Sequence, residues 1–302
     1  MVYSEYRPTG LLAKGIIMNM HVGIGYEDRY FYSGGHKLRA RLFLTAETPR
    51  AVAVLHPATG VPQRYYADFA RWLAQDRNIA CLTYDYRDFG ASARVHMRES
   101  RANMSDWGVH DQQAARDHLA ATFPGAPLWV IGHSLGGFLL PFQKDLHRID
   151  RVITVASGPV HLSDHPFPYR FVAAAYWYLV GPPATALAGY MPGRRVGMGT
   201  DIPAGVFWQW RRWCTSRGFF AADIGHKLPM PDWDGVKAPT KIVAIKDDQM
   251  VPPAAVWRLM SFYPTAPKQQ LVVGPSKYGL ERIGHIGPFA ARNAAIWPDL
   301  IA

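Results

Sequence analysis

One serine lies in a sequence pattern that is typical of a catalytic nucleophile. The pattern Gly132-His133-Ser134-Leu135-Gly136 follows a buried-type run at 128–132 and precedes a segment, 138–146, that we expect to be helical. Glycines are needed because side chains would collide across a tight strand-to-helix turn. Such a turn exposes the Ser134 hydroxyl, and the helix start places the Leu135 N–H beside a developing oxyanion. A glycine–serine turn without chemistry is the alternative.

A serine nucleophile needs a base, and the base needs an acid to orient it. In sheets that carry this turn, the order along the chain is serine, acid, histidine. His285 is the only histidine that follows the acidic pair Asp247-Asp248. We predict Asp248 as the acid because Val251-Pro252 follows at the distance that turns the loop. Asp247 is the alternative acid, or else a helper or a solvated neighbour.

The second oxyanion donor is expected from the loop after the strand at 51–55. His56-Pro57-Ala58-Thr59-Gly60 occupies that position. We predict the Ala58 N–H as the donor, and the Thr59 hydroxyl could assist it.

The elements around these residues indicate an α/β fold with a doubly wound, mostly parallel sheet. Two strands joined by Gly34-Gly35 form an antiparallel start, and buried strands then alternate with helices. The strands are expected at 27–33, 37–44, 51–55, 79–84, 128–132, 152–156, 241–245 and 270–273, and the helices at 63–75, 109–122 and 138–146.

The alternation stops between the strands at 152–156 and 241–245. This part of the chain contains 14 of the 39 aromatic residues and five of the ten Trp. We therefore expect a helical, aromatic-rich lid at 159–239, inserted into a core made of 27–158 and 240–302, with 1–26 as an N-terminal extension. Residues 171–193 carry no charge, but Gly181-Pro182-Pro183 should break a spanning helix into two short apolar helices.

With these residues in hand, the sequence resembles the α/β-hydrolase superfamily, near predicted bacterial hydrolases of the serine-aminopeptidase-like and monoacylglycerol-lipase-like branch. The resemblance implies an eight-stranded sheet, a lid after the sixth strand, and Ser134, Asp248 and His285 as the triad. It also implies an acyl-serine intermediate, because relatives with Asp at the nucleophile position form alkyl-enzyme esters instead. Pro57 and Asp88 depart from the family pattern. The motifs are GHSLGG at 132–137, HPATG at 56–60, YDYRDFGAS at 84–92, DDQMVPP at 247–253 and GHIGPF at 284–289.

Composition argues against a nucleic-acid partner, a disulfide framework and a bound metal. The net charge of +10 is scattered, and no basic run of five or more marks a nucleic-acid binder. Cys81 and Cys214 are far apart and predict reduced, buried thiols in a cytoplasmic protein. We expect neither a cofactor nor a metal, because His161 and His165 lack a firm third ligand.

These patterns predict a serine hydrolase of the carboxylesterase type that cleaves an apolar or aromatic carboxylic ester, a small-molecule substrate whose acyl-chain size is not predicted. The lid has eight basic residues, five Asp and no Glu, which argues mildly against binding the ammonium group of a peptide. The alternatives are an acyltransferase or thioesterase with the same triad, or a non-catalytic ligand-binding protein. Stable membrane insertion is not expected, contact of the lid with a membrane interface stays open, and the oligomeric state is not predicted. Candidate substrate-binding residues are His133, Thr59, His161, Tyr176, Trp177 and Trp208.

Overall fold

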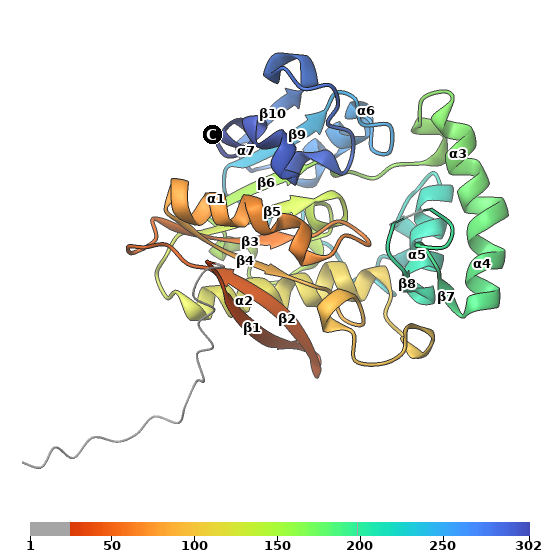
Figure 1. The fold of residues 1–302 in the computed structure, drawn as a ribbon, viewed down its shortest axis with the longest axis horizontal. Helices are drawn as coiled ribbons and strands as arrows, with labels where there is room; N and C mark the ends of the chain where they lie inside the picture. Colours follow the sequence, from red (N-terminus) through yellow and green to blue (C-terminus); the bar gives the residue numbers. More distant parts are fainter. Residues whose placement is uncertain (1–24, 198) are drawn as a thin grey trace, which may run out of the picture.

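The computed structural model describes residues 25–197 and 199–302, so almost all of the expected extension 1–26 lies outside the described residues. Its main feature is an eight-stranded sheet with the order β1-β2-β4-β3-β5-β6-β9-β10 (Figure 1). β1 and β2 pair antiparallel with each other, as do β2 and β4, and the other pairs are parallel. The prediction of a doubly wound, mostly parallel sheet is confirmed. The strands are β1 (Glu27–Ser33), β2 (His36–Phe43), β3 (Ala51–His56), β4 (Ile79–Tyr84), β5 (Leu128–His133), β6 (Arg151–Val155), β9 (Thr240–Ile245) and β10 (Lys268–Val273).

The central strands β3, β4, β5 and β9 are buried along their whole length, because helices cover both faces of the sheet. Along β3, Val52 and Val54 belong to one buried cluster, and Ala53 and Leu55 belong to the other. The first cluster includes residues of α2 (Gln112–Thr122), and the second includes residues of α1 (Ala67–Arg77) and α7 (Trp297–Ile301). The period of two in the strand therefore divides the core into two layers.

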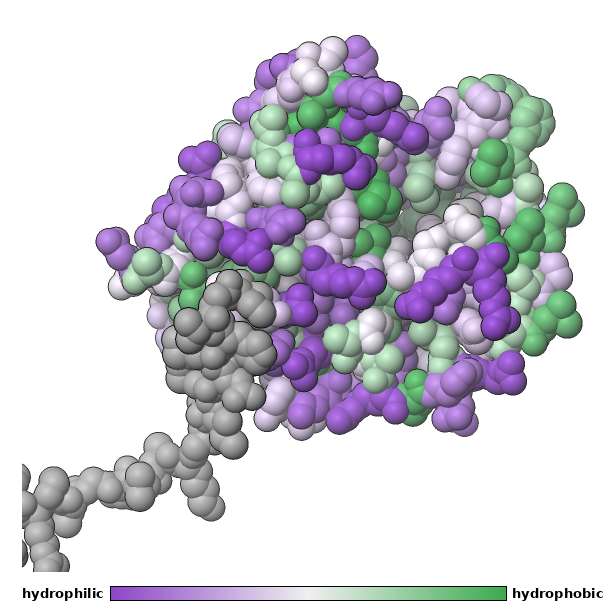
Figure 2. Space-filling view, viewed as in Figure 1, coloured by the Kyte–Doolittle hydropathy of each residue, from purple (hydrophilic) through white to green (hydrophobic). Residues whose placement is uncertain are grey.

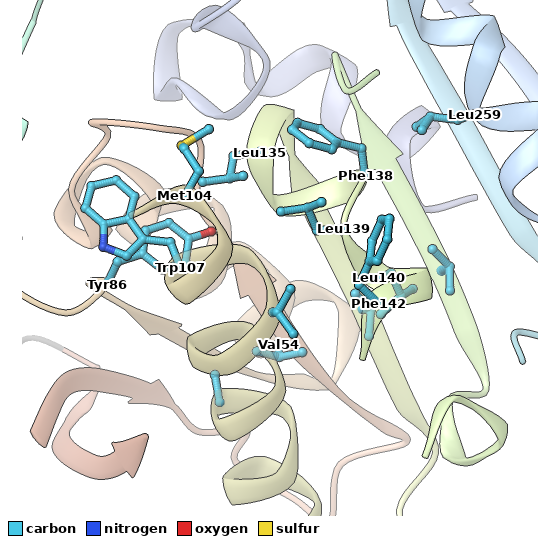
Figure 3. Close-up of a cluster of buried hydrophobic side chains, with 14 of the residues drawn as sticks. Val54, Tyr86, Met104, Trp107, Leu135, Phe138, Leu139, Leu140, Phe142 and Leu259 are labelled. Atoms are coloured by element: carbon cyan, nitrogen blue, oxygen red, sulfur yellow. The ribbon is translucent and has the colours of Figure 1, made fainter. Parts of the chain in front are cut away.

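The helix expected at 138–146 does not form. The chain makes short 3-10 turns at Ser134–Gly137, Leu140–Phe142 and Leu146–Arg148. Its run of apolar residues is buried on all sides, next to Val54 and Trp107 (Figure 3). Pro141 also supplies no N–H to a helix. The helix expected at 63–75 begins later than predicted, after a 3-10 turn at Gln63–Tyr66. The helix expected at 109–122 forms, and helical backbone already precedes it in a π-helical turn at Asp106–Asp111.

Residues 159–239, which we call the inserted segment, lie between β6 and β9. The small α6 (Pro253–Val256) follows β9. In Figure 1 the helices of the inserted segment stand beside the sheet. Its elements are α3 (Tyr169–Ala175), α4 (Gly181–Ala188), the short strands β7 (Tyr190–Met191) and β8 (Ile202–Pro203), and α5 (Ala204–Thr215).

The predicted break at Gly181-Pro182-Pro183 is absent. One helix runs from Tyr169 to Ala188, passing through a π-helical turn at Tyr176–Val180. The two prolines follow Gly181 in the first turn of α4, where a missing N–H costs little. By length and composition alone this helix could cross a membrane, and 28% of its most apolar window is buried in the protein.

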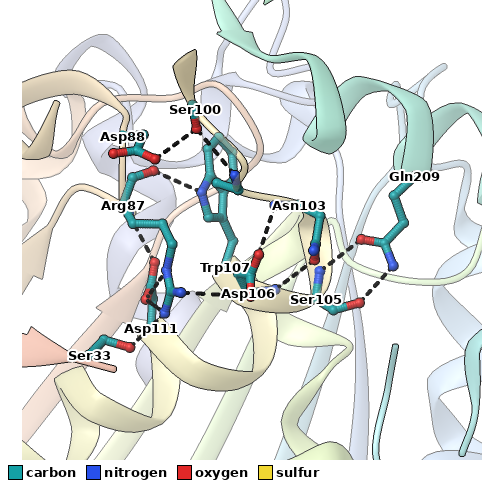
Figure 4. A network of polar contacts seen from close by, with 11 residues as sticks. Ser33, Arg87, Asp88, Ser100, Asn103, Ser105, Asp106, Trp107, Asp111 and Gln209 are labelled. Atoms are coloured by element: carbon teal, nitrogen blue, oxygen red, sulfur yellow. Dashed lines mark hydrogen bonds and ion pairs between the residues drawn. The ribbon is translucent and has the colours of Figure 1, made fainter. Parts of the chain in front are cut away.

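A polar network connects the core to the inserted segment (Figure 4). The Arg87 Nε donates to Asp111 Oδ1 at 2.9 Å, and both side chains are almost fully buried. The Trp107 indole N–H donates to the Arg87 carbonyl at 3.0 Å. On the same stretch of chain, the Ser105 N–H donates to Gln209 Oε1 of α5 at 3.0 Å. The network fixes α5 relative to the sheet.

Candidate active site

The turn after β5 needs glycine on both sides of Ser134. Ser134 has φ +52°, a left-handed conformation that non-glycine residues rarely adopt. A Cβ on Gly132 would lie 2.3 Å from the carbonyl oxygen of Gly136. A Cβ on Gly136 would lie 2.1 Å from the carbonyl oxygen of His56. The turn therefore has no room for side chains at Gly132 and Gly136, as the sequence predicts. The regular helix expected after the turn is absent.

The structure brings the three predicted triad residues together. His285 Nε2 lies 3.0 Å from Ser134 Oγ, and His285 Nδ1 lies 2.7 Å from Asp248 Oδ2. The N–H groups of Met250 and Val251 donate to Asp248 Oδ1 at 2.8 and 2.9 Å. Because Nδ1–H donates to the carboxylate, Nε2 is left to accept the proton of the serine hydroxyl.

Asp247, the alternative acid, has a different partner. Its Oδ2 accepts the N–H groups of Ile283 and Gly284 at 3.0 and 3.1 Å. These residues directly precede His285, so Asp247 holds the histidine loop and does not contact the imidazole. It is a structural helper of Asp248.

His133 is not a substrate-binding residue, contrary to the prediction, because its side chain is fully buried behind Ser134. Burial, with the nearby His285 adding to it, lowers the pKa of His133 to about 3, so the ring is neutral near pH 7. Nε2 lies 2.9 Å from the carbonyl oxygen of His285, which can only accept, so Nε2 carries the proton. Nδ1 therefore accepts the hydroxyl proton of Tyr66 at 2.8 Å.

The same tyrosine corrects the prediction for Ala58. The Ala58 N–H donates to Tyr66 Oη at 2.9 Å, and Ala58 is buried. Its N–H is thus already engaged by Tyr66. Thr59, the next residue, lines the cavity that contains Ser134.

Ser134 opens into an inner cavity of about 60 Å³ under the inserted segment. Thr59, Tyr176 and Trp177 line it as predicted. Among the described residues that line the cavity, none is Asp, Glu, Lys or Arg. Lining residues that the sequence did not indicate include Met104, Phe138, Val160, Val172, Cys214, Phe219 and Met250. His165, Tyr169 and Trp210 also line the cavity.

His161 and Trp208 lie away from this cavity, which corrects both predictions. The His161 side chain accepts the Ser163 N–H at 3.1 Å and lies at a separate surface depression. Trp208 is 39% exposed on α5. Trp210 and Cys214, one helical turn apart on α5, face the cavity instead, and this spacing was visible in the sequence.

A larger groove of about 780 Å³ adjoins the inner cavity. The two share Thr59, Tyr169, Tyr176, Trp210 and Met250. The groove is open to the surface, so it gives the inner cavity a route to solvent. No group of three His, Cys, Asp or Glu suited to a metal occurs within residues 25–197 and 199–302.

Gly136→Ala tests the close approach of the turn to β3. Because the new methyl group would overlap the His56 carbonyl, we expect a loss of about 3 kcal/mol in the free energy of unfolding, measured in urea. Gly218→Ala is the control, since its Cβ would meet only Ala221 at 3.4 Å. Equal stability of the two variants would contradict the described turn.

Comparison with known proteins agrees with this architecture. The sequence profile described as the Alpha/beta hydrolase family matches residues 53–296. The chain therefore belongs to the Alpha/beta hydrolase family. No curated protein sequence matches it significantly.

Solved structures with a similar fold include a serine hydrolase, an esterase and a thioesterase domain. An α/β serine hydrolase without a lid from Xanthomonas campestris is 13% identical with a TM-score of 0.52, covering 94% of this chain and 96% of that one. A thermophilic esterase from Thermogutta terrifontis is 17% identical with a TM-score of 0.51, covering 91% and 95%. The thioesterase domain of the curacin biosynthetic pathway is 15% identical with a TM-score of 0.55, covering 92% and 99%. At these identities the likeness establishes the fold.

Proposed function

We propose that this hydrolase is a serine esterase that cleaves uncharged carboxylic esters with a small apolar or aromatic acyl group. One observation carries the proposal. The chain Ser134 Oγ, His285 Nε2, His285 Nδ1 and Asp248 Oδ2 is continuous at hydrogen-bond distance and opens into an apolar cavity.

The geometry supports an acyl-serine mechanism. His285 Nε2 takes the Ser134 proton as Oγ attacks the ester carbonyl carbon, and Asp248 stabilises the imidazolium that forms. The tetrahedral intermediate collapses when Nε2–H protonates the leaving alcohol, which leaves the acyl group on Oγ. A water molecule, deprotonated by Nε2, then attacks the acyl carbon. Release of the carboxylic acid returns the proton to Ser134.

Two backbone groups are proposed to bind the oxyanion. The Leu135 N–H follows the nucleophile, where such a donor is expected. We assign the second donor to the Thr59 N–H in place of Ala58, because Thr59 lines the cavity beside Ser134. In the described part of the chain the Thr59 N–H has no backbone acceptor, whereas the Ala58 N–H is held by Tyr66.

The size of the inner cavity favours a short acyl group. Its volume of about 60 Å³ holds roughly four water-sized groups, since each needs about 10–15 Å³ on this measure. The open groove is more than ten times larger and suits the alcohol part of the ester. Absence of charged side chains among the described lining residues of the inner cavity argues for an uncharged acyl chain.

A panel of p-nitrophenyl esters tests this assignment. We expect butyrate to exceed octanoate in kcat/KM for the wild type. Trp177→Ala removes an indole from the cavity wall and should raise the octanoate-to-butyrate ratio by about tenfold. The ratio is measured on one preparation, so partial unfolding of the variant cancels.

Trp208→Ala is the matched control, because Trp208 lies on α5 outside the cavity. An unchanged ratio in Trp177→Ala, or an equal shift in both variants, would contradict the acyl assignment. Excess thiol or alcohol acceptor in the same assay separates hydrolysis from the alternatives of acyl transfer and thioester chemistry. Binding of an apolar ester without any turnover would favour the non-catalytic alternative.

A further inference from the structure

The helix Tyr169–Ala188 presents large apolar side chains to solvent. Phe171 is 67% exposed, Leu179 is 72% exposed and Leu187 is 86% exposed. Figure 2 shows strongly apolar residues gathered over α3 and α4, whereas most of the remaining visible surface is polar or mixed. We call this the outer face, and it comprises Phe167, Phe171, Val172, Tyr178, Leu179, Val180 and Leu187.

The inner side of the same helix is also apolar. Ala173, Tyr176 and Trp177 are buried, and all three line the inner cavity. A surface helix of a water-soluble protein ordinarily has a polar side toward solvent, and a helix that is apolar all round is buried against something. The outer face therefore lacks the polar side chains that contact with water alone would favour.

The helix and the loop that follows it along the chain carry charge of one sign. Between Asp164 and Asp201 the chain has no acidic residue and has three arginines, Arg170, Arg194 and Arg195. Arg170 lies 4.7 Å from the ring centroid of Phe167, at the start of the helix. Arg194 and Arg195 follow the end of the helix and are exposed.

Two further arginines reach the helix from other elements. The Arg98 Nε donates to the Ala188 carbonyl at 2.8 Å, at the end of α4. Arg211 of α5 lies 5.2 Å from the ring centroid of Tyr178 and donates to the Trp177 carbonyl at 2.6 Å. Cations thus border the apolar face at both ends and along one side.

We propose that the outer face docks on the surface of an anionic lipid membrane, with the helix Tyr169–Ala188 lying in the plane of the interface. Apolar side chains enter the boundary between headgroups and acyl chains, and the bordering arginines contact anionic headgroups. The helix does not span the bilayer in this arrangement, because its inner side packs on α5 and lines the cavity. The protein as a whole, with a net charge of +10, is attracted to such a surface.

Docking of the outer face on a membrane indicates a substrate class, and this step rests on the proposed esterase function. Val172 belongs to the outer face and also lines the inner cavity, so the lipid surface and the catalytic serine lie on two sides of one helix. The substrate class is then an ester whose alcohol part is lipophilic enough to reside in the membrane. Its short acyl group enters the inner cavity.

The test is flotation of the whole protein with vesicles, carried out with the Ser134→Ala variant so that binding is measured apart from turnover. Vesicles are phosphatidylcholine alone, or phosphatidylcholine with about one third phosphatidylglycerol. We expect roughly tenfold stronger partitioning onto the anionic vesicles, and loss of that preference in high salt. The variant Phe171→Ser/Leu179→Ser/Leu187→Ser should reduce partitioning by roughly 100-fold.

The control variant Tyr32→Ser/Met230→Ser/Val272→Ser changes three exposed apolar residues elsewhere and should bind vesicles as before. Equal binding of the two triple variants, or no preference for anionic vesicles, would overturn the proposal. So would a dimer in sedimentation that the outer-face variant converts to a monomer while neither protein floats, because the face would then bind a second copy. Wild-type turnover of p-nitrophenyl butyrate is measured separately. Its absence with flotation intact would refute the esterase and leave the docking.

Discussion

Ser134→Ala is expected to lower kcat for p-nitrophenyl butyrate on the order of 10⁶-fold. The alanine leaves no oxygen to attack the carbonyl, and the remaining rate comes from the oxyanion donors and from binding alone. The turn itself should persist, because serine and alanine both carry a single Cβ atom at φ +52°. Steady-state rates measure the loss of kcat. Urea unfolding of the same preparation measures whether the fold around the turn persists.

The control for this substitution is Ser157→Ala. The Ser157 hydroxyl donates to the Ser134 carbonyl at 2.6 Å, so it belongs to the turn without reaching the substrate as a nucleophile. We expect this variant to retain activity within about tenfold, at a stability cost of about 1 kcal/mol for one hydrogen bond. If Ser134→Ala retained wild-type kcat, Ser134 would not be the nucleophile.

Asp248→Asn should lower kcat by about 10⁴-fold, the second largest effect. The amide removes the negative charge that stabilises the imidazolium of His285. It can also donate to His285 Nδ1, which would place the proton on Nε2 and prevent that atom from accepting the serine proton. Steady-state kinetics on p-nitrophenyl butyrate measure the loss.

Asp247→Asn is the matched control for the acid. Asp247 accepts two backbone N–H groups through one oxygen, and an asparagine carbonyl oxygen can accept both. We therefore expect kcat within about tenfold of the wild type. A larger loss in Asp247→Asn than in Asp248→Asn would reverse the assignment of the acid.

The sheet, and the meeting of the Ser134, His285 and Asp248 side chains, could be expected from the sequence because both depend on local patterns. Buried runs such as 51–55 and 79–84 lie within a residue of the observed strands. Gly132 and Gly136 flank Ser134 for a steric reason that can be stated without coordinates. The order of Ser134, Asp248 and His285 then follows the order of the strands.

The loop 56–60 was predicted less well than the sheet, because the partner of a peptide N–H here is a side chain outside the loop. Tyr66 binds the Ala58 N–H and the ring of His133, and nothing in the spacing of these residues indicates that contact. The prediction that His133 contacts the substrate was wrong for the same reason, because its contact with Tyr66 is not indicated by the spacing. Its burial depends on β5 and the loop of His285 meeting behind the serine.

In the inserted segment, the rule that proline breaks a helix gave a wrong prediction. Pro182 and Pro183 predicted a break, but the π-helical turn before them places both at the start of α4. The unbroken helix then produces the outer face, which the sequence showed only as an uncharged stretch. At 138–146 a helix was expected and does not form. The apolar residues of this stretch, which includes Pro141, are buried in short turns.

The most direct measurement of the central claim is labelling by a fluorophosphonate, followed by intact mass and peptide mapping. We expect one adduct per chain on the peptide that contains Ser134, none in Ser134→Ala, and much slower labelling in Asp248→Asn than in Asp247→Asn. An adduct at another residue, or none in the folded wild type, would show that Ser134 is not the nucleophile.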